Sequence, residues 1–241
     1  MKLSEKIRTK INKFSRGKTF GYADLEIERK EYLTAAKVLE RLQKKGIIKK
    51  ITKGVFYKPE QTVFGELKPD IDEQLKKYLF KNGKRIAYVT GLLLYNRLNL
   101  TTQVPYRIKI ASRSNRISIS RGTLKADAVK SYLEVTDKNY ELLGFLDAIK
   151  DIKKIPDTTV NTSVKILTAK IKALNDKKMK EMVQYVLFYP PRVRALLGAI
   201  LENINSSVSA QKLKYSLNPL TKFKFGLKDD VLINIKDWNI E

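Results

Sequence analysis

The chain has 241 residues, of which 43% are apolar, so it is long enough for one large or two ordinary globular domains. Its 49 lysines and arginines outnumber 25 acidic residues, and the net charge of +24 attracts polyanions or acidic protein surfaces. The sequence contains no cysteine and no histidine, which excludes disulfides, thiolate chemistry and Ser-His or Cys-His catalysis, and argues against zinc sites.

The N-terminal residues lead into an amphipathic pattern rather than an apolar signal sequence, and no run of eighteen apolar residues follows anywhere. We therefore expect a soluble, cytoplasmic protein with no membrane partner. The first predicted helix places Leu3, Ile7, Ile11 and Phe14 on one face and is broken near Gly17. A short second helix is predicted over residues 20–27.

The third predicted helix, residues 33–45, is the most informative segment. Its apolar stripe includes Leu39 and Leu42, and Gly46 follows it where a helix C-terminus favours a residue with positive φ. Two short strands are predicted next, joined by the turn Thr52-Lys53-Gly54. A basic helix followed by a basic hairpin is typical of a winged helix-turn-helix, which binds DNA.

In this interpretation, the third helix enters the major groove and the hairpin contacts phosphates. Arg41 has the fork for bidentate guanine recognition, and Lys37 could do the same less specifically. The alternatives are a solvated charged helix face or a winged helix that binds protein. The predicted DNA-binding residues are Tyr32, Thr34, Lys37, Arg41, Lys44, Lys45, Lys49, Lys50 and Lys53.

The domain organisation follows from these patterns. We predict an α+β protein with a winged helix at 1–60, a connector helix within 61–84, and a mixed, helix-rich α/β domain at 85–241. In that last domain, alternation predicts strands over 104–111, 116–121 and 132–136. Helices are predicted over 90–98, 140–150 and most of 162–205, with Pro191 in the first turn of the last long one.

Catalytic motifs are weak in this chain. Asp70-Ile71-Asp72 has the spacing of a nucleotidyltransferase metal pair but lacks the preceding Gly-Ser. Asp127 with Glu134 comes closest to a nuclease pattern, yet Thr136 stands where a lysine is needed. No glycine-rich phosphate loop occurs. We therefore expect a protein that is not an enzyme, with no catalytic residues, no metal and no cofactor.

Five further arginines form a possible surface for a partner or an anion. Arg192 and Arg194 follow Pro190-Pro191 at a helix start, where a cation is unfavourable without an anionic partner. The alternative is that they cap a surface helix. The other three, which lie on or beside the predicted strands, are Arg113, Arg116 and Arg121.

The order of several segments resembles the AbiEi antitoxins of bacterial abortive-infection toxin–antitoxin pairs. The segments are Lys53-Gly54-Val55-Phe56-Tyr57-Lys58-Pro59, Ala87-Tyr88-Val89-Thr90-Gly91, Leu100-Thr101-Thr102-Gln103-Val104-Pro105, residues 142–152 and residues 189–198. The resemblance runs nearly end to end, and residues 100–105 and 189–198 are its most specific parts.

The resemblance implies a separate nucleotidyltransferase-like toxin as partner, autorepression of the operon through inverted repeats in double-stranded DNA, and antitoxin activity in the C-terminal region. Family DNA contacts correspond here to Lys37, Arg41 and Lys53. We therefore expect an antitoxin and transcriptional autorepressor. Two alternatives remain open: a ligand-responsive winged-helix regulator, and a nuclease subunit that uses the winged helix to dock on DNA.

Overall fold

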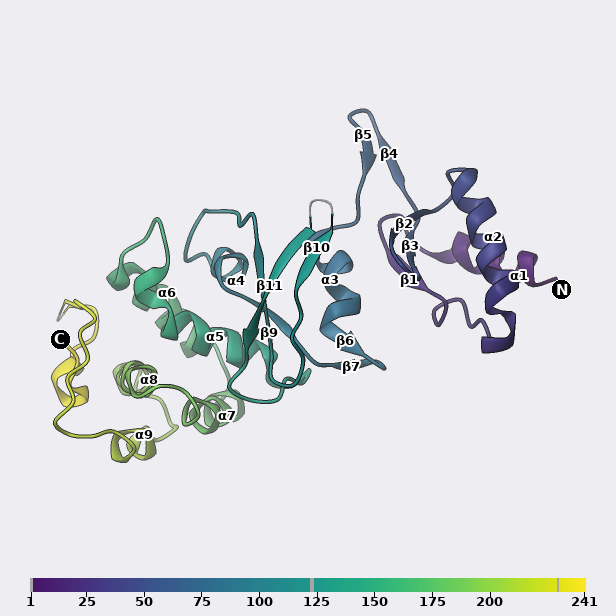
Figure 1. The fold of residues 1–241 in the computed structure, drawn as a ribbon. Coiled ribbons are helices and arrows are strands. Elements are labelled where there is room, and N and C mark those ends of the chain that lie inside the picture. Colours follow the sequence, from purple (N-terminus) through teal and green to yellow (C-terminus); the bar gives the residue numbers. More distant parts are fainter. Residues whose placement is uncertain (1, 122–123, 229) are drawn as a thin grey trace. The chain divides into compact units, whose positions relative to one another are not determined.

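The computed structural model describes residues 2–121, 124–228 and 230–241 and shows a mixed α+β protein (Figure 1). The chain divides into two compact units, Met1–Tyr78 and Leu79–Glu241, which we call unit 1 and unit 2. The segment predicted as a connector, residues 61–84, contributes a hairpin and most of a helix to unit 1 and a short hairpin to unit 2.

Unit 1 combines helices with a three-stranded antiparallel sheet of order β1-β3-β2 and a separate two-stranded hairpin. Its elements are α1 (Leu3–Lys13), β1 (Thr19–Gly21), the 3-10 helix η1 (Arg29–Glu31), α2 (Tyr32–Lys44), β2 (Lys49–Thr52), β3 (Val55–Tyr57), β4 (Glu60–Thr62), β5 (Gly65–Leu67) and α3 (Ile71–Leu79).

The predicted first helix, basic helix and hairpin are confirmed as α1, α2 and β2–β3. The hairpin turns at Gly54, and α2 is followed by Gly46; both glycines have positive φ, 75° and 70°. The core of unit 1 forms where buried faces of α1 and α2, including Ile7 and Leu39, meet Phe56 of the sheet.

The helix predicted over residues 20–27 is wrong. Phe20 lies in β1 opposite Phe56 of β3, and the chain then turns, because the Gly21 amide donates to the Asp24 carboxylate at 2.8 Å and Glu26 has a φ of 50°. Leu25, from the turn, is fully buried in the core. The segment predicted as a helix is therefore a strand followed by a compact turn.

Unit 2 contains the four-stranded sheet β10-β11-β9-β8, in which β9 and β11 are parallel and the other pairs antiparallel. Its strands are β6 (Phe80–Lys81), β7 (Lys84–Arg85), β8 (Tyr88–Thr90), β9 (Ile108–Ser112), β10 (Ile119–Arg121) and β11 (Leu124–Lys130). Its helices are α4 (Leu92–Arg97), α5 (Tyr140–Lys150), η2 (Ile152–Lys154), α6 (Val160–Lys172), α7 (Asp176–Val186), α8 (Pro191–Asn203), α9 (Gln211–Tyr215) and η3 (Ile235–Trp238).

Two strand predictions in unit 2 need correction. Residues 132–136 form no strand: Tyr132 packs its ring against that of Tyr189, with centroids 4.2 Å apart, and the amide of Thr136 donates to Asn139 at the start of α5. The long strand is β11 instead, which the sequence did not reveal because alanines at 126 and 128 are weak strand formers. The strands predicted over 104–111 and 116–121 are shortened to β9 and β10.

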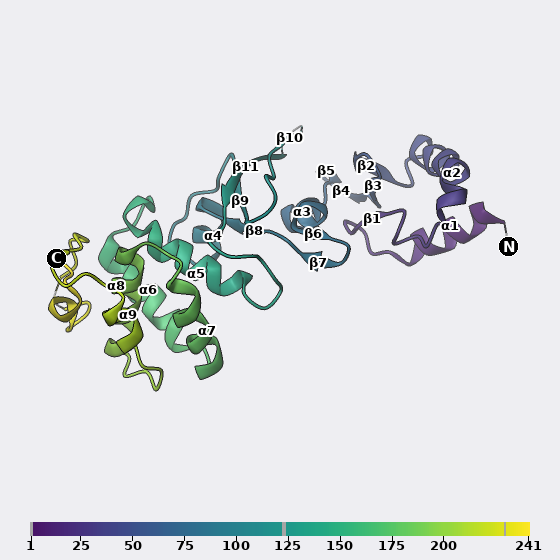
Figure 2. The same ribbon diagram turned by 60° about the horizontal axis from the view of Figure 1, so that its bottom comes forward.

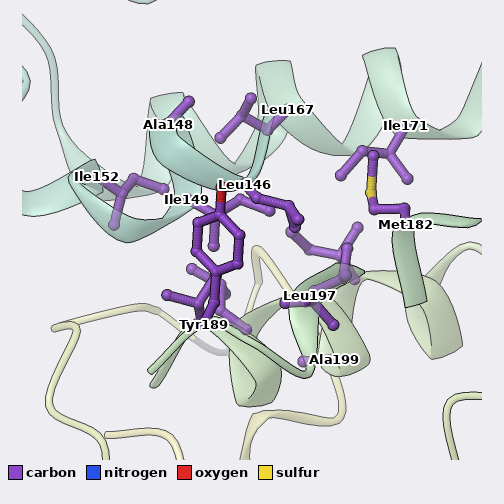
Figure 3. Packing of buried hydrophobic residues seen from close by; sticks show 14 of the residues in the cluster. Leu146, Ala148, Ile149, Ile152, Leu167, Ile171, Met182, Tyr189, Leu197 and Ala199 are labelled. Atoms are coloured by element: carbon purple, nitrogen blue, oxygen red, sulfur yellow. The ribbon is translucent and has the colours of Figure 1, made fainter. Parts of the chain in front are cut away.

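The helices predicted over 90–98, 140–150 and 162–205 are confirmed, and Pro191 begins α8 as expected. Helices α5–α9 gather to one side of the sheet in both views (Figures 1 and 2). They enclose the larger core, in which Tyr189 directs its hydroxyl toward α5 (Figure 3). Gly198 of α8 lies against Trp238, and a methyl group at residue 198 would be only 2.1 Å from the indole.

None of the helices within the described ranges has the length and apolar character needed to cross a membrane.

Candidate nucleic-acid interface

Helix α2 and the β2–β3 hairpin together carry the residues predicted to bind DNA. Helix α2 buries Val38, Leu39 and Leu42 against the core of unit 1. Lys37 and Arg41, one helical turn apart, are exposed on a different face, so the helix is held by its apolar side and presents cations to solvent. All the predicted contacts are exposed: Tyr32, Thr34, Lys37, Arg41, Lys44, Lys45, Lys49, Lys50 and Lys53.

Among the described residues, carboxylates form ion pairs with two of these cations. Lys44 pairs with Glu40 at 3.1 Å, and Lys49 pairs with Glu66 of β5. Within the described ranges, no ion pair involves Lys37, Arg41, Lys45, Lys50 or Lys53. This surface therefore keeps most of its positive charge available for an external anion.

Aromatic contacts connect the hairpin turn to the start of α2. The rings of Tyr22 and Tyr32 lie 5.0 Å apart, and Tyr22 also meets Phe56 edge-on at 6.4 Å. Gly21 and Gly54 approach so closely that a Cβ on Gly21 would lie 3.0 Å from the Gly54 carbonyl oxygen. The turn that carries Lys53 is therefore held beside the first turn of α2.

Sequence reasoning missed two residues of this surface. Leu33 is 83% exposed in the first turn of α2 and lies on the same helical face as Lys37 and Arg41. An exposed leucine at this place can contact thymine methyl groups, and its spacing of four from Lys37 was the available signal. Tyr22 lay within the helix predicted over residues 20–27, and only the turn conformation reveals its contact with Tyr32.

The β4–β5 hairpin is anchored to the same sheet. Glu66 accepts a hydrogen bond from the Tyr57 hydroxyl at 2.8 Å and pairs with Lys49. Burial, together with this carboxylate, raises the pKa of Tyr57 to about 12. At the hairpin tip, Val63 and Phe64 are almost completely exposed. The hairpin thus has a base fixed to the sheet and an exposed apolar tip.

Arg192 and Arg194, predicted as possible anion ligands, are instead bound to carbonyl groups of unit 2. The Arg192 guanidinium donates to the carbonyl of Lys150, the last residue of α5, at 2.6 Å. Arg194 donates to the carbonyl of Ser216, which follows α9, at 2.9 Å. A cation at a helix C-terminus complements the helix dipole, so both arginines connect helices within the unit.

Arg113 and Arg116 lie in the loop after β9 and are exposed, as the predicted surface requires. Arg113 donates one hydrogen bond to the carbonyl of Ser131 at 3.3 Å. Together with Lys130 they border a groove of about 430 Å³. Arg121 ends β10, and its side chain falls outside the described part of the structure.

The carboxylates considered for a nuclease are each engaged by a neighbour. Asp127 is paired with the guanidinium of Arg107, whose Nε lies 2.8 Å away, and this contact lowers the pKa of Asp127. Glu134 accepts a hydrogen bond from Ser114. The described residues contain no cluster of three or more carboxylates that could hold a metal ion.

A buried polar network lies where three of the segments quoted for the family resemblance meet. The Asp147 carboxylate, in α5, accepts hydrogen bonds from Tyr88 and Thr90 of β8 at 2.8 and 2.7 Å. It also pairs with Lys150 at 3.0 Å and lies 3.4 Å from the Tyr189 hydroxyl. These contacts join the sheet to α5 and to the start of α8 through one carboxylate.

The network shifts the protonation of its members. Burial lowers the pKa of Lys150, but the charge of Asp147 outweighs burial, so the pKa of Lys150 is raised. Burial and the same carboxylate raise the pKa values of Tyr88 and Tyr189. The lysine therefore remains charged and the tyrosines neutral at physiological pH.

Comparison with known proteins identifies the family. The sequence model of a family of unknown function, DUF6088, matches residues 6–183, which includes both α2 and the sheet of unit 2. The chain belongs to DUF6088. A search of curated proteins found no match for this DUF6088 protein.

A solved crystal structure is similar to this DUF6088 protein over most of its length. The crystal structure of the RV2827C protein from Mycobacterium tuberculosis aligns with a TM-score of 0.55 and 12% identity. The alignment covers 92% of this chain and 85% of that one. At this identity the likeness concerns the fold alone, and it extends through both units.

Proposed function

We propose that unit 1 is a winged-helix DNA-binding domain and that the protein acts as an AbiEi-type antitoxin that represses its own operon. The proposed DNA binding is supported by the exposed cationic face of α2 and the β2–β3 hairpin. On this face, Lys37, Arg41 and Lys53 have no carboxylate partner among the described residues. DNA presents the dense line of negative charge that such a face attracts.

The order of elements in unit 1 supports this assignment. Helix α2 is followed directly by the antiparallel hairpin β2–β3. Strand β1, which precedes the helix in the sequence, pairs with β3 and completes the sheet. In a winged helix, the corresponding helix lies in the major groove and the hairpin contacts the neighbouring backbone. Arg41 is then the residue suited to read guanine, whereas Lys53 in the hairpin turn contacts phosphate.

The proposal has a quantitative consequence for salt dependence. If one unit 1 neutralises about six phosphates, log affinity falls with log salt at a slope of about −5. Affinity then decreases about a thousandfold between about 50 and 200 mM salt. Binding to protein carboxylates would give a shallower slope, since no condensed counterion layer is released.

We test the DNA-binding half by fluorescence anisotropy of the full chain on DNA from upstream of its gene and on scrambled DNA, at about 150 mM salt. We expect about a hundredfold preference for the upstream DNA. Arg41→Ala should reduce the binding free energy for upstream DNA by about 1–3 kcal/mol and lower the preference for it. Lys53→Ala should weaken binding to both DNAs equally. Lys180→Ala, an exposed lysine in unit 2, is the charge-matched control. Equal weak binding to both DNAs would contradict the repressor role.

The antitoxin half rests on the family resemblance, which implies a nucleotidyltransferase-like toxin encoded beside this gene. Co-expression with that neighbour should restore growth, and unit 2 is the part expected to supply the effect. Persistent growth arrest despite abundant antitoxin would refute this half. The DNA-binding variant Arg41→Ala should still protect, because it leaves unit 2 unchanged.

A further inference from the structure

We propose that the groove beside Arg113, Arg116 and Lys130 in unit 2 is a binding site for a phosphate group, supplied either by a free nucleotide or by a nucleic-acid backbone. This site lies in unit 2, apart in sequence from the cationic face of unit 1. The inference does not depend on the proposed antitoxin or repressor function.

The topology of the sheet places the groove where ligands commonly bind. Strands β9 and β11 are parallel, and their register pairs Ser112 with Lys130, so their carboxyl ends lie side by side. The loop after β9 and the residue after β11 therefore meet at one sheet edge. In sheets with parallel strands, loops at the carboxyl ends form the usual ligand sites.

The groove has a volume of about 430 Å³. This lies within the range of about 300–1,000 Å³ typical of small-molecule sites. Its lining combines charged, hydroxyl and amide groups from residues 112–116 with the aliphatic surface of Ala128 and Val129. A nucleotide has matching parts, since its phosphates require donors and its base or sugar can lie against apolar atoms.

Three cations border the groove without a carboxylate partner among the described residues. Arg113 uses Nη1 to hold the Ser131 carbonyl, which leaves the other guanidinium donors free. Arg116 and Lys130 are exposed and form no ion pair in the described ranges. The carboxylate in the neighbouring segment, Glu134, accepts a hydrogen bond from the Ser114 hydroxyl, and the three cations outnumber it. The local field therefore favours an anion.

The groove is held in shape before any ligand arrives. The Ser112 hydroxyl donates to the carbonyl of Ile86 at 2.6 Å, and the amide of Ser131 donates to the Ser112 carbonyl at 3.0 Å. The ends of both strands are thus fixed to each other and to the segment before β8. A preformed site loses less conformational entropy when a ligand binds.

Phosphate fits this chemistry better than a protein carboxylate surface. Two arginines offer planar forks for bidentate contact with phosphate oxygens, and the Asn115 side chain adds a neutral donor. The site is a small concavity, whereas a stable protein interface needs about 800 Å² of matching surface on each partner. An acidic protein is therefore an outcome for the test and not part of the proposal.

The test uses the full chain with two probes, ATP and a ten-nucleotide single-stranded RNA. Isothermal titration calorimetry compares Arg113→Ala/Arg116→Ala with Lys177→Ala/Lys180→Ala, a control that removes two exposed lysines of α7 and has the same net charge. Hydrogen exchange then locates protection on peptides from residues 108–131. The matched charge corrects for nonspecific attraction of RNA to the rest of this basic protein.

We expect the arginine variant to weaken binding at least about tenfold relative to the control, with ligand-dependent protection of residues 112–116. If the arginine variant binds ATP more weakly, the phosphate comes from a free nucleotide. If only its binding to RNA is weakened, the phosphate belongs to a nucleic-acid backbone. Equal losses in both variants, or no protection at residues 112–116, would overturn the proposal. Failure of both probes to bind the parent chain would also overturn it, whatever the result for upstream DNA.

Discussion

Replacing Asp147 by asparagine tests whether one buried carboxylate holds unit 2 together. The substitution keeps the size of the side chain but removes the charge that pairs with Lys150 and that accepts from Tyr88 and Thr90. Asparagine has a single acceptor oxygen, which must face the lysine. Its amide then faces hydroxyls that have to reverse their hydrogen bonds.

The size of the effect follows from the burial of this group. Asp147 is 2% exposed, and breaking a buried ion pair costs about 3–5 kcal/mol. Two features reduce that cost: the Lys150 side chain is 20% exposed, and Asp151 offers a second carboxylate at 3.9 Å. We therefore expect a loss of about 2–4 kcal/mol. For a domain of this size, the melting temperature falls by about 5–15 °C.

The assay uses the only tryptophan of the chain, Trp238, which is buried in unit 2. Its fluorescence follows the unfolding of unit 2 without a contribution from unit 1. The double variant Asp147→Asn/Lys150→Met should recover part of the loss, because it removes the unpaired lysine. A single-variant loss below about 1 kcal/mol would refute the idea that this carboxylate organises the unit.

Three further predictions follow from described contacts. Gly198→Ala should destabilise unit 2 by at least about 3 kcal/mol, because the methyl group meets Trp238; an unchanged fluorescence midpoint would contradict this. Lys150 and Tyr189 hold their protons more tightly in the folded state, so the stability of unit 2 should be constant up to about pH 10 and fall above it. If the urea concentration at the midpoint of unfolding stays constant up to about pH 11, these two groups do not contribute. Glu73→Gln should speed amide exchange in β1 about tenfold by weakening two hydrogen bonds from that strand. Although burial raises the pKa of Glu73, these bonds lower it more, so the parent protein should lose the same protection as pH falls below about 4.

Local patterns in the sequence predicted the elements whose stability is local. Helix α2 and its glycine stop followed from the spacing of Leu39 and Leu42 and from Gly46, and both are present. The turn after β1 could not be predicted in this way. Its apolar residues match a helix until Phe20 is seen to pair with Phe56, a contact between residues distant in the sequence.

The same limit applies to the candidate sites. Exposure of the basic residues on α2 could be predicted, since they lie away from an apolar stripe. The groove beside Arg113 could not, because it depends on the parallel pairing of β9 with β11, and β11 carries alanines that give little strand signal. Arg192 was ambiguous in sequence, and only the position of the α5 carbonyl shows what it binds.

The contact between Gly198 and Trp238 can form only near the end of synthesis. Unit 1 is complete once residue 78 has left the ribosome, so it can fold while the rest of the chain is being made. Helix α8 lacks its indole cover until Trp238 has been translated, and until then a buried face of unit 2 stays open to water. For much of translation, a nascent chain therefore carries a folded unit 1 and a unit 2 whose apolar core is incomplete, and exposed apolar surface of this kind is what chaperones bind.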